Sequence, residues 1–564
     1  MRRTVSIGNQ SFEDIRKNNY FYTDKTDFIR EWWETGDTVT LITRPRRFGK
    51  TLNMNMLDCF FSNKYAERAD LFEGLKIWKE EKYRELQGTF PVIFVTFAGV
   101  KGTDYESTVK GIKKEIAGVF DKYDFLRKFS ELTENEFKAL KAVSENMSDV
   151  DAEYSLKLLS TLLHKFYKKK VLILLDEYDT PMQEAYINGY WDDITAFIRT
   201  MFNNTFKTNP SLDRAVLTGI TRVSKESIFS DLNNLKVITT TSEQYETCFG
   251  FTEEEVFAAM DEQGIDPSQK ELVKKWYDGF TFGRVTDIYN PWSIISYLDE
   301  KRLKTYWANT SSNGLIGKLI REGDSIIKTE FEKLLRGEYI ESIIDEQIIF
   351  DQLGKKTNAV WSLLLASGYL KVMETLPTEN AAISLYRLVL TNREVKTMFE
   401  QMIQDWFEEA PFFGDFVDAL FKGDEIDLNE YMYRVALNIF STFDTADKRN
   451  TGQEPERFYH GLVLGLLVDR THGYILKSNR ESGYGRYDVI LEPKDVKNKA
   501  VIIEFKVLSK ARGEKTLEDT AANALKQIED RKYDTDLLSR GIPKENILKY
   551  GFAFEGEKCL IRRG

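Results

Sequence analysis

Four continuous apolar runs alternate with helical stretches in the first part of the chain, and this alternation limits the fold more than any other feature. Unbroken apolar runs are typical of strands that are buried on both faces, as in parallel sheets. The runs cover residues 38–43, 91–97, 171–175 and 214–220, and helical patterns lie between them, for example at residues 52–61 and 155–168. The alternation predicts an α/β fold in which a parallel sheet carries helices on both faces.

The rest of the chain follows other patterns. From about residue 251 to residue 392 the pattern is mostly helical, and Thr252 with Glu255 forms a capping box at the start of one helix. Short helices before a strand-like stretch at 368–374 suggest a small winged-helix-like unit in this middle region. Amphipathic helices at 394–407 and 428–440 lead into the last module.

The length of 564 residues is too great for one hydrophobic core, so several domains are expected. We divide the chain into a first α/β domain at residues 1–245, a helical or winged-helix-like region at 246–395 and a last α/β domain at 396–564. The core of the last domain covers about residues 454–564, with a helix near 456–468, a hairpin at 487–507, a helix near 517–532 and a strand at 547–554.

Composition excludes several classes of protein. The net charge of −11 argues against a dedicated nucleic-acid coat protein, although the stretch from residue 454 onward is slightly basic and can meet phosphate. Cys59, Cys248 and Cys559 lie far apart, which argues against a zinc site or a disulfide framework and favours a reducing cytoplasm. No apolar run approaches the roughly 20 residues of a membrane span, and no signal peptide is expected.

The segment from residue 38 to residue 51 reads TVTLITRPRRFGKT, in which an apolar strand passes through a basic turn into Gly49, Lys50 and Thr51. A phosphate-binding loop has the pattern G-x-x-x-x-G-K-[ST] between a strand and a helix. In that pattern Gly49 lets the backbone approach phosphate, Lys50 reaches the β- and γ-phosphates, and the Thr51 hydroxyl ligates Mg²⁺. Arg44 stands at the position of the first glycine, and a short Gly-Lys-Thr also occurs where no nucleotide binds.

Acidic residues at the end of the third apolar run support nucleotide binding. The run at 171–175 continues into Asp176, Glu177, Tyr178 and Asp179. Carboxylates at the end of a buried parallel strand are costly unless they serve a cation. In phosphoryl transfer Asp176 would hold Mg²⁺ and Glu177 would polarise an attacking water. The alternative is a strand that ends in an ordinary polar turn.

The fourth apolar run adds polar residues near its end. These residues are Thr218, Thr221 and Arg222. A polar side chain at this strand end could sense the γ-phosphate, and Arg222 could contact the same charge from its own chain or from a neighbour. The alternative is a loop arginine with a structural partner.

Taken together, these segments resemble the bacterial AAA-ATPase-like family. The matching stretches are FEDIRKNNYFYTDK at 12–25, LITRPRRFGKT at 41–51, LLDEYD at 174–179, GITRVSKESIFSDLNNL at 219–235 and NPWSI at 290–294. The resemblance implies an ATP-binding P-loop core with an altered phosphate loop, in which arginines precede Gly49 and Arg47 belongs to the nucleotide-binding residues. It also implies a PD-(D/E)xK nuclease domain at the C-terminus, which members of the family typically carry.

The C-terminal part has a pattern of its own that fits such a nuclease. Asp488 lies near the start of a strand at 487–491, and after a polar turn residues 500–507 read AVIIEFKV. Because strand side chains alternate between faces, Glu504 and Lys506 share one face. A hairpin would bring Asp488 close to Glu504. In a PD-(D/E)xK site two such carboxylates hold Mg²⁺ or Mn²⁺, the metal activates water, and the lysine orients that water.

Other residues fit the same site less closely. Tyr487 stands where the pattern nominally has proline. Glu456, or else Glu454, begins a preceding helix and could supply a further metal carboxylate, and Gln527 with Tyr533 could touch the metal site or nucleic acid. The alternative for an isolated Glu-x-Lys is a salt bridge on an edge strand.

The leading interpretation is an ATP-regulated nuclease that cleaves DNA or RNA. Its predicted catalytic residues are Asp488, Glu504, Lys506 and Glu177; its predicted cofactors are ATP and Mg²⁺, with Mn²⁺ as an option at the nuclease site. The predicted partner is a nucleic acid, no membrane is expected, and the sequence indicates no oligomeric state. The alternative is a signalling or scaffold NTPase that uses nucleotide as a switch and whose nuclease-like domain only binds nucleic acid or protein.

Overall fold

The computed structural model describes most of the chain. The described residues are 2–221, 228–229, 232–307, 314–321, 323, 325–344, 353, 356–377, 384–408, 413–440, 473–478, 481–482, 485–486, 489–509, 512–555 and 558–564. They form two compact units, and each is described by itself. The first unit is Met1–Leu315 with Tyr339–Lys396, and the second is Ile316–Glu338 with Thr397–Gly564.

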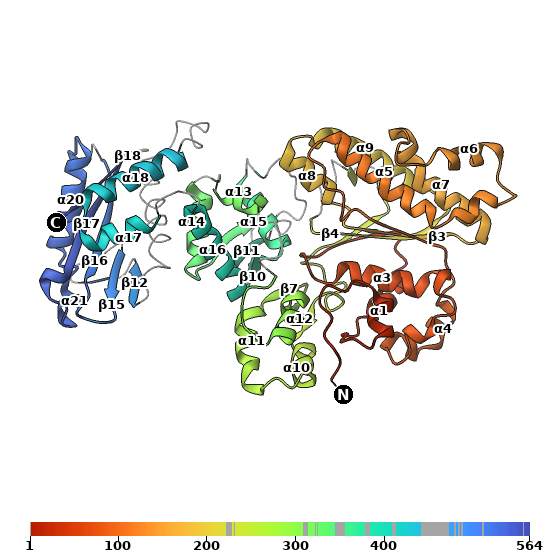
Figure 1. Ribbon diagram of the computed structural model, residues 1–564, viewed down its shortest axis with the longest axis horizontal. Helices are drawn as coiled ribbons and strands as arrows, with labels where there is room; N and C mark the ends of the chain where they lie inside the picture. Colours follow the sequence, from red (N-terminus) through yellow and green to blue (C-terminus); the bar gives the residue numbers. More distant parts are fainter. Residues whose placement is uncertain are drawn as a thin grey trace. The chain divides into compact units, whose positions relative to one another are not determined.

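A five-stranded parallel sheet forms the centre of the first unit (Figure 1), in the order β2-β3-β4-β1-β5. Its strands are β1 (Val39–Thr43), β2 (Val92–Thr96), β3 (Val171–Asp176), β4 (Leu212–Gly219) and β5 (Leu235–Ile238). The four predicted strands are confirmed as β1 to β4, and β5 was not predicted. Every residue of β1 and β3 is buried, as their unbroken apolar sequences require.

Helices cover both faces of this sheet, as predicted (Figure 1). On one face lie α5 (Tyr105–Asp121), α7 (Asp149–Tyr167) and α9 (Trp191–Phe202), and on the other lie α1 (Phe12–Lys17), α3 (Lys50–Phe61) and α4 (Glu81–Leu86). Further helices of this part are α2 (Asp27–Thr35), α6 (Glu134–Ala142) and α8 (Thr180–Asn188). The start of α7 is fixed by Ser148, whose side chain accepts a hydrogen bond from the Asp151 amide, and its buried face is made largely of leucines.

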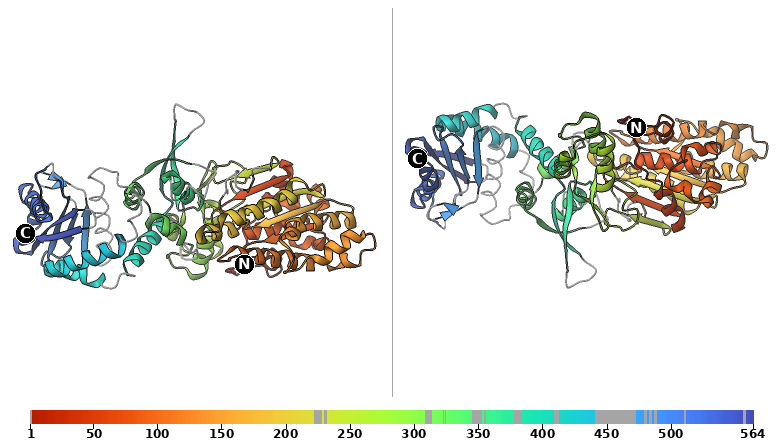
Figure 2. Two further views of the ribbon diagram at one scale, coloured as in Figure 1. Left: turned by 90° about the horizontal axis from the view of Figure 1, so that it is seen from above. Right: turned by 90° about the horizontal axis from the view of Figure 1, so that it is seen from below.

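The remainder of the first unit holds helices and two small antiparallel sheets. The helices are α10 (Glu253–Glu262), α11 (Lys270–Tyr277), α12 (Pro291–Glu300) and α15 (Thr357–Ala366). The sheets are β6 (Phe251–Thr252), β8 (Val285–Tyr289) and β7 (Phe280–Phe282), in that order, and β10 (Leu370–Leu376), β11 (Leu385–Leu390) and β9 (Ile340–Ile343). Figure 2 shows β10 and β11 as a paired ribbon that extends beyond α15. The capping box of Thr252 and Glu255 is confirmed.

The middle region therefore contains more strand than its mostly helical pattern predicted. Its strands are short, and only the stretch at 368–374 had a strand-like sequence, which became β10. The burial of β9 alternates, with Ile340 and Ser342 inside and Glu341 and Ile343 outside. Four residues are too few for such alternation to be distinguished from a helix turn, so pairing with β11 decides the conformation.

A second five-stranded sheet forms the centre of the second unit. Its order is β12 (Tyr474–Ser478), β15 (Val489–Pro493), β16 (Ala500–Val507), β17 (Ile547–Glu555) and β18 (Lys558–Arg563). Only the pair of β16 and β17 is parallel. Residues of α17 (Phe413–Lys422) and α18 (Glu425–Phe440) pack on one face, and α20 (Leu517–Asp530) and α21 (Thr535–Ser539) pack on the other. Three further helices, α14 (Ser325–Leu335) and most of α13 (Gly314–Arg321) and of α16 (Arg393–Glu408), belong to this unit.

The predicted elements of this module are present where the structure describes them. The hairpin is β15 with β16, the helix is α20 and the last predicted strand is β17, while β18 was not predicted. The helix predicted near 456–468 lies outside the described residues. Among the described residues, no helix combines the length and the apolar character needed to cross a membrane.

Candidate functional site

The loop between β1 and α3 carries the predicted phosphate-binding residues. Gly49 caps α3 with φ 80°, a left-handed conformation that favours glycine, and Lys50 is the first helical residue. The first amides of α3 therefore point into the loop with the positive end of the helix dipole behind them. Arg47 also has a positive φ, 65°, and its exposed guanidinium lies 4.5 Å from the centre of the Trp292 ring.

Lys50 is buried inside this loop, with 5% of its surface exposed. Its ammonium donates hydrogen bonds to the main-chain oxygens of Arg44 and Pro45, at 3.0 and 2.9 Å. Within the described residues it makes no ion pair. Burial lowers the pKa of the Lys50 ammonium, and the negative charge of Glu177 is the main influence that raises it. A buried cation held by neutral carbonyls gains most from an anion such as phosphate.

Asp176 at the end of β3 receives two hydroxyl groups from neighbouring elements. Thr51 Oγ1 of α3 donates to Asp176 Oδ2 at 2.7 Å, and Thr218 Oγ1 of β4 donates to Asp176 Oδ1. The sheet order explains the second bond, because β4 lies between β1 and β3. Burial raises the pKa of Asp176, while the two hydroxyl donors lower it. A threonine hydroxyl beside a carboxylate is a ligand pair of the kind that Mg²⁺ accepts.

The two other acidic residues after β3 have different surroundings. Glu177 has φ 51° and is half-buried, and Thr180 Oγ1 donates to its carboxylate at 3.3 Å. Asp179 is buried, and its Oδ2 accepts from the amides of Ile220 and Thr221 at 3.0 and 2.9 Å and from the Thr221 hydroxyl at 2.9 Å. Asp179 therefore fixes the turn after β4, and Thr221 serves in that turn. Arg222, predicted to contact nucleotide, lies outside the described residues.

Arg44, in the position of the first glycine of the loop pattern, is fully buried. Its guanidinium donates to the main-chain oxygens of Thr43, Thr239 and Gln244, at 2.9, 2.6 and 3.3 Å, and lies 4.6 Å from the centre of the Phe282 ring. Burial lowers the pKa of Arg44 to about 10. Arg44 therefore ties the loop to the segment after β5, a role that the glycine pattern does not contain and the sequence did not reveal.

A group of side chains on β16 and α20 forms the centre of the C-terminal candidate site. Glu504 is 3% exposed and Lys506 is half-buried, and both lie on the face of β16 that α20 covers. Lys506 Nζ donates to Gln527 Oε1 at 2.6 Å, and Gln527 Nε2 donates to Glu504 Oε1. The same Nε2 lies 3.0 Å from the Tyr533 hydroxyl. Gln527 thus joins the carboxylate of Glu504 to the ammonium of Lys506. Phe505, which lies between them on the strand, packs in the core on the opposite face of the sheet.

The second predicted carboxylate of this site cannot be placed. The hairpin register pairs Val489 with Ile503, and Asp488, the next residue toward Glu504, lies outside the described residues. Glu456 lies outside them as well. The described part of the site is a buried carboxylate and an ammonium two residues apart on one strand, which is the donor set expected beside a hard cation and its bound water.

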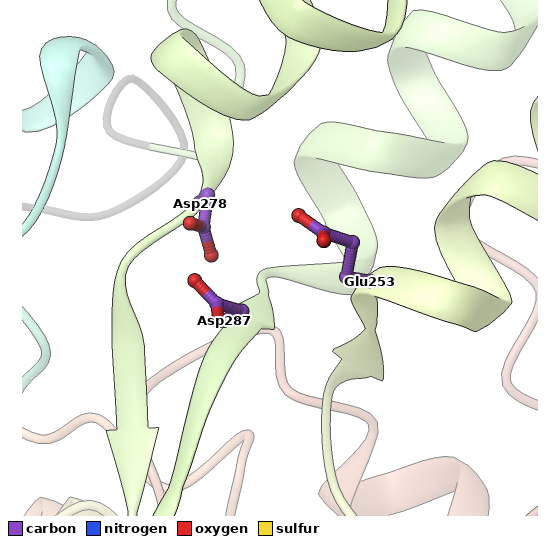
Figure 3. Close-up of side chains that lie close together, drawn as sticks. All are labelled: Glu253, Asp278 and Asp287. Carbon is purple, nitrogen blue, oxygen red and sulfur yellow. The ribbon is translucent and has the colours of Figure 1, made fainter.

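The structure contains a third group of acidic residues, which the sequence did not predict. Glu253, Asp278 and Asp287 each bring a carboxylate oxygen within 4.8 Å of the others (Figure 3). Burial and the neighbouring Asp287 raise the pKa of Asp278 to about 7. Lys274 Nζ lies 2.5 Å from Glu253 and 3.7 Å from Asp287, so a cation of the chain already occupies this group. The three residues come from the start of α10, the end of α11 and β8, a meeting that only the fold creates.

The folds and residues described define a chain with two modules. The first is a parallel α/β sheet with a helix-capping Gly-Lys-Thr loop, and the second is a mixed sheet with a buried Glu-x-Lys strand. Residues 6–229 match the family model described as predicted AAA-ATPase, and residues 454–564 match that of the PD-(D/E)XK nuclease superfamily. The chain therefore holds one region similar to predicted AAA-ATPases and one similar to the PD-(D/E)XK nuclease superfamily, as the resemblance in its motifs implied.

One curated relative covers almost the whole chain. It is the "Uncharacterized protein in vnfD 5'region" of Azotobacter chroococcum mcd 1, which is 25% identical over 557 residues. The match covers 96% of this chain and 95% of the relative. The similarity therefore extends over both regions and the stretch between them.

Proposed function

We propose that the protein is a nuclease regulated by ATP, in which the loop at residues 44–51 binds ATP with Mg²⁺ and the β16 site cleaves nucleic-acid phosphodiesters. The observation that carries the proposal is the linked set of Glu504, Gln527 and Lys506. A buried carboxylate and an ammonium held by one amide cost free energy on desolvation, which a bound cation and a phosphate would offset. The match to the PD-(D/E)XK nuclease superfamily supports the same activity.

The chemistry of the nuclease site follows from its donors. Glu504 and Asp488 would hold Mg²⁺ or Mn²⁺, which supplies Lewis-acid activation of water and charge neutralisation at phosphate. The Lys506 ammonium donates hydrogen bonds and cannot accept one, so it would orient the water or stabilise negative charge on the phosphate. Gln527 would keep Lys506 and Glu504 in place. Glu456 is the proposed source of a further carboxylate.

The nucleotide site would use the groups that surround Lys50. Lys50 and the first amides of α3 would bind the β- and γ-phosphates, and Thr51 with Asp176 would hold Mg²⁺. Glu177 would polarise the attacking water. Arg47, which is exposed, would contact phosphate from solvent, and Arg222, which follows Thr221 in the chain, would contact it as well.

Regulation requires a connection from the loop to the nuclease, and hydrogen bonds of the first unit offer one. The main-chain oxygen of Arg46 accepts from Trp307 Nε1 at 3.0 Å and from Asn290 Nδ2 at 3.2 Å. Glu394 is buried and accepts from the Trp307 amide at 2.7 Å and from Ser293 Oγ at 2.8 Å. Glu394 lies on α16, whose residues from Thr397 onward belong to the second unit. A loop that moves on binding phosphate would therefore disturb the start of this helix.

A cleavage assay tests the nuclease proposal. Full-length protein is incubated with DNA and RNA in Mg²⁺ or Mn²⁺, with and without ATP. Glu504→Gln should abolish cleavage, and Glu518→Gln, an exposed glutamate of the same module, should not. If wild-type protein cleaves neither polymer in either metal, the nuclease proposal fails.

The link to α16 has its own test. Trp307→Phe removes the indole hydrogen bond to Arg46 while it retains most of the buried ring. We expect cleavage without ATP to be unchanged and the effect of ATP to be reduced. An unchanged response to ATP in this variant would contradict the proposed link.

A nucleotide switch without turnover is the second candidate function. Its specific support is the loop itself, because Arg44 replaces the first glycine and Lys50 is held by the loop's own carbonyls. In that case ATP would bind without being hydrolysed, and Glu177→Gln would change neither binding nor phosphate release. The three cysteines form no disulfide, and we propose a cytoplasmic location for either function.

A further inference from the structure

An exposed group of aromatic rings lies on the first unit, away from the nucleotide loop of that unit. Phe125, Phe166 and Tyr167 are 38%, 37% and 37% exposed, and Phe129 is half-buried beside them. We call these four residues the aromatic surface. Together with Lys128 and Ser130 they line an open hollow of about 330 Å³. Exposed aromatic rings gathered in one place are uncommon and usually mark a binding surface.

The rings of the aromatic surface hold each other in position. The ring centres of Phe125 and Phe166 are 4.9 Å apart, those of Phe129 and Phe166 are 5.1 Å apart, and those of Phe166 and Tyr167 are 4.9 Å apart. Phe166 is therefore the centre of the group. Rings fixed by such contacts lose little conformational freedom when a flat partner stacks on them.

Basic residues border the aromatic surface. Lys128 lines the hollow, and Lys168, Lys169 and Lys170 follow Tyr167 directly in the chain. Lys168 is paired with Glu131, but both side chains are more than half exposed, at 69% and 55%. An exposed pair of this kind contributes little and exchanges readily for another anion. The Lys169 ammonium lies 3.6 Å from the centre of the Phe90 ring, so Lys128 in the hollow and the exposed Lys168 and Lys170 after Tyr167 remain for phosphate.

The place of the aromatic surface separates it from the nucleotide loop. Residues 168–170 directly precede β3, and the Tyr123 hydroxyl, close to Phe125, donates to the main-chain oxygen of Val92 at the start of β2. The nucleotide residues follow the other end of these strands, where Asp176 ends β3. Six residues of strand span about 20 Å. The rings therefore cannot take part in the chemistry at Lys50.

We propose that the aromatic surface binds a single-stranded polynucleotide. Flat rings stack on unpaired bases of any sequence, and lysines beside them contact the phosphates, which is the combination found in sequence-tolerant single-strand binding. Among the described residues, the hollow is lined by four aromatic residues, one lysine and one serine, with no aliphatic side chain of the kind that would fill a peptide groove. The aromatic surface would bind a single strand on the first unit whether or not the C-terminal module cleaves that strand.

Fluorescence anisotropy of a labelled 20-nucleotide single strand of mixed sequence tests this proposal. The full-length protein is titrated in EDTA, so that no cleavage takes place. The double variant Phe125→Ala/Phe166→Ala should weaken binding about tenfold, since one stacked base contributes on the order of 1 to 3 kcal/mol. Lys128→Glu should weaken binding and make it less dependent on salt. A duplex of the same sequence should not respond to the double variant, because its bases are already stacked.

Matched variants distinguish base stacking on the rings from loss of packing and from self-association. Tyr154→Ala, which removes another exposed ring of α7, should leave the affinity unchanged. Phe166→Leu retains apolar packing without a flat ring, and it should also weaken binding if the alanine variant proves unstable. Unchanged affinity in both Phe125→Ala/Phe166→Ala and Phe166→Leu would overturn the proposal. So would unchanged affinity combined with altered self-association in light scattering, which would assign the rings to contact with a second copy. Lys506→Ala, measured in parallel, shows how much of the affinity depends on the C-terminal module.

Discussion

The two candidate sites hold their lysines in different ways. Lys50 in the first unit is held by main-chain oxygens of its own loop, whereas Lys506 in the second unit is held by the side chain of Gln527. Main-chain acceptors remain when neighbouring side chains change, but they move when the loop moves. A side-chain acceptor on a helix, such as Gln527 on α20, remains in place with that helix but is lost by a single substitution. The difference favours a first site whose loop changes when a ligand binds and a second site that is preorganised by side chains.

The largest effect is expected at the second site. Lys506→Ala should reduce metal-dependent cleavage by about 100- to 1000-fold, because in the proposed site it removes the donor that would act on the reacting phosphate. Calorimetry should find Mn²⁺ binding retained, since an ammonium is no metal ligand. Asp488→Ala should lose cleavage and metal binding together.

The control for these variants is Lys526→Ala, which removes an exposed lysine on α20 next to Gln527. It should cleave like the wild type. If Asp488→Ala still cleaves, the active site lies elsewhere in the chain.

The matching variant at the first site should weaken nucleotide binding. Lys50→Ala would remove the proposed charge-assisted hydrogen bond to phosphate, so we expect the Kd for ATP with Mg²⁺ to rise about 100-fold. The unit should remain folded, because the loss of a donor to two main-chain oxygens is offset by removal of the buried ammonium and its desolvation cost. Isothermal titration calorimetry measures the change, with the exposed Lys114→Ala as control. Equal affinity in Lys50→Ala and wild type would exclude this loop as the nucleotide site.

Variants of Gln527 test whether side chains preorganise the second site. Gln527→Leu should lower kcat about 10- to 100-fold with little change in KM, as do changes in residues that orient metal-site ligands. Gln527→Glu still accepts from Lys506 but places a negative charge beside Glu504. The pH profile of cleavage should then move to higher pH. A purely structural role for Gln527 would change thermal stability and leave that profile in place.

The smallest effect concerns the acidic group of the middle region. With a pKa of about 7 in the folded protein, Asp278 binds more protons than the unfolded chain between about pH 4 and pH 7. Stability should therefore fall as pH rises through this window and remain lower above it. Asp278→Asn should stabilise the first unit by roughly 1 to 2 kcal/mol more at pH 8 than at pH 4.5. Calorimetric midpoints measure this, and exposed Asp299→Asn is the control. An equal gain at both pH values would contradict the assignment.

Much of the fold followed from local sequence. The strands β1 and β3 are apolar almost throughout because both of their faces are buried, and such runs are recognisable without a structure. The alternation in β16 also placed Glu504 and Lys506 on one face from the sequence alone. In both cases a single element determines the pattern.

The features that the sequence did not reveal depend on several elements. The sheet of β6, β8 and β7 is built from strands too short to show a period, and Asp278 meets Asp287 only because α11 and β8 converge. The burial of Arg44 depends on carbonyls about 200 residues away in sequence. At the candidate sites, residue types and spacing could be predicted, whereas the bonds that hold Arg44 and Lys50 could not.

Arg44 also bears on any attempt to convert this loop to the usual glycine-first pattern. Arg44→Gly would leave the main-chain oxygens of Thr43, Thr239 and Gln244 facing the space that the guanidinium had filled. Buried acceptors without donors cost about 1 to 3 kcal/mol each. The substitution that restores the familiar sequence would therefore separate the loop from the segment that steadies it. In this chain Arg44 and the carbonyls that it binds act as one unit, so the glycine-first loop cannot be restored by a change at this position alone.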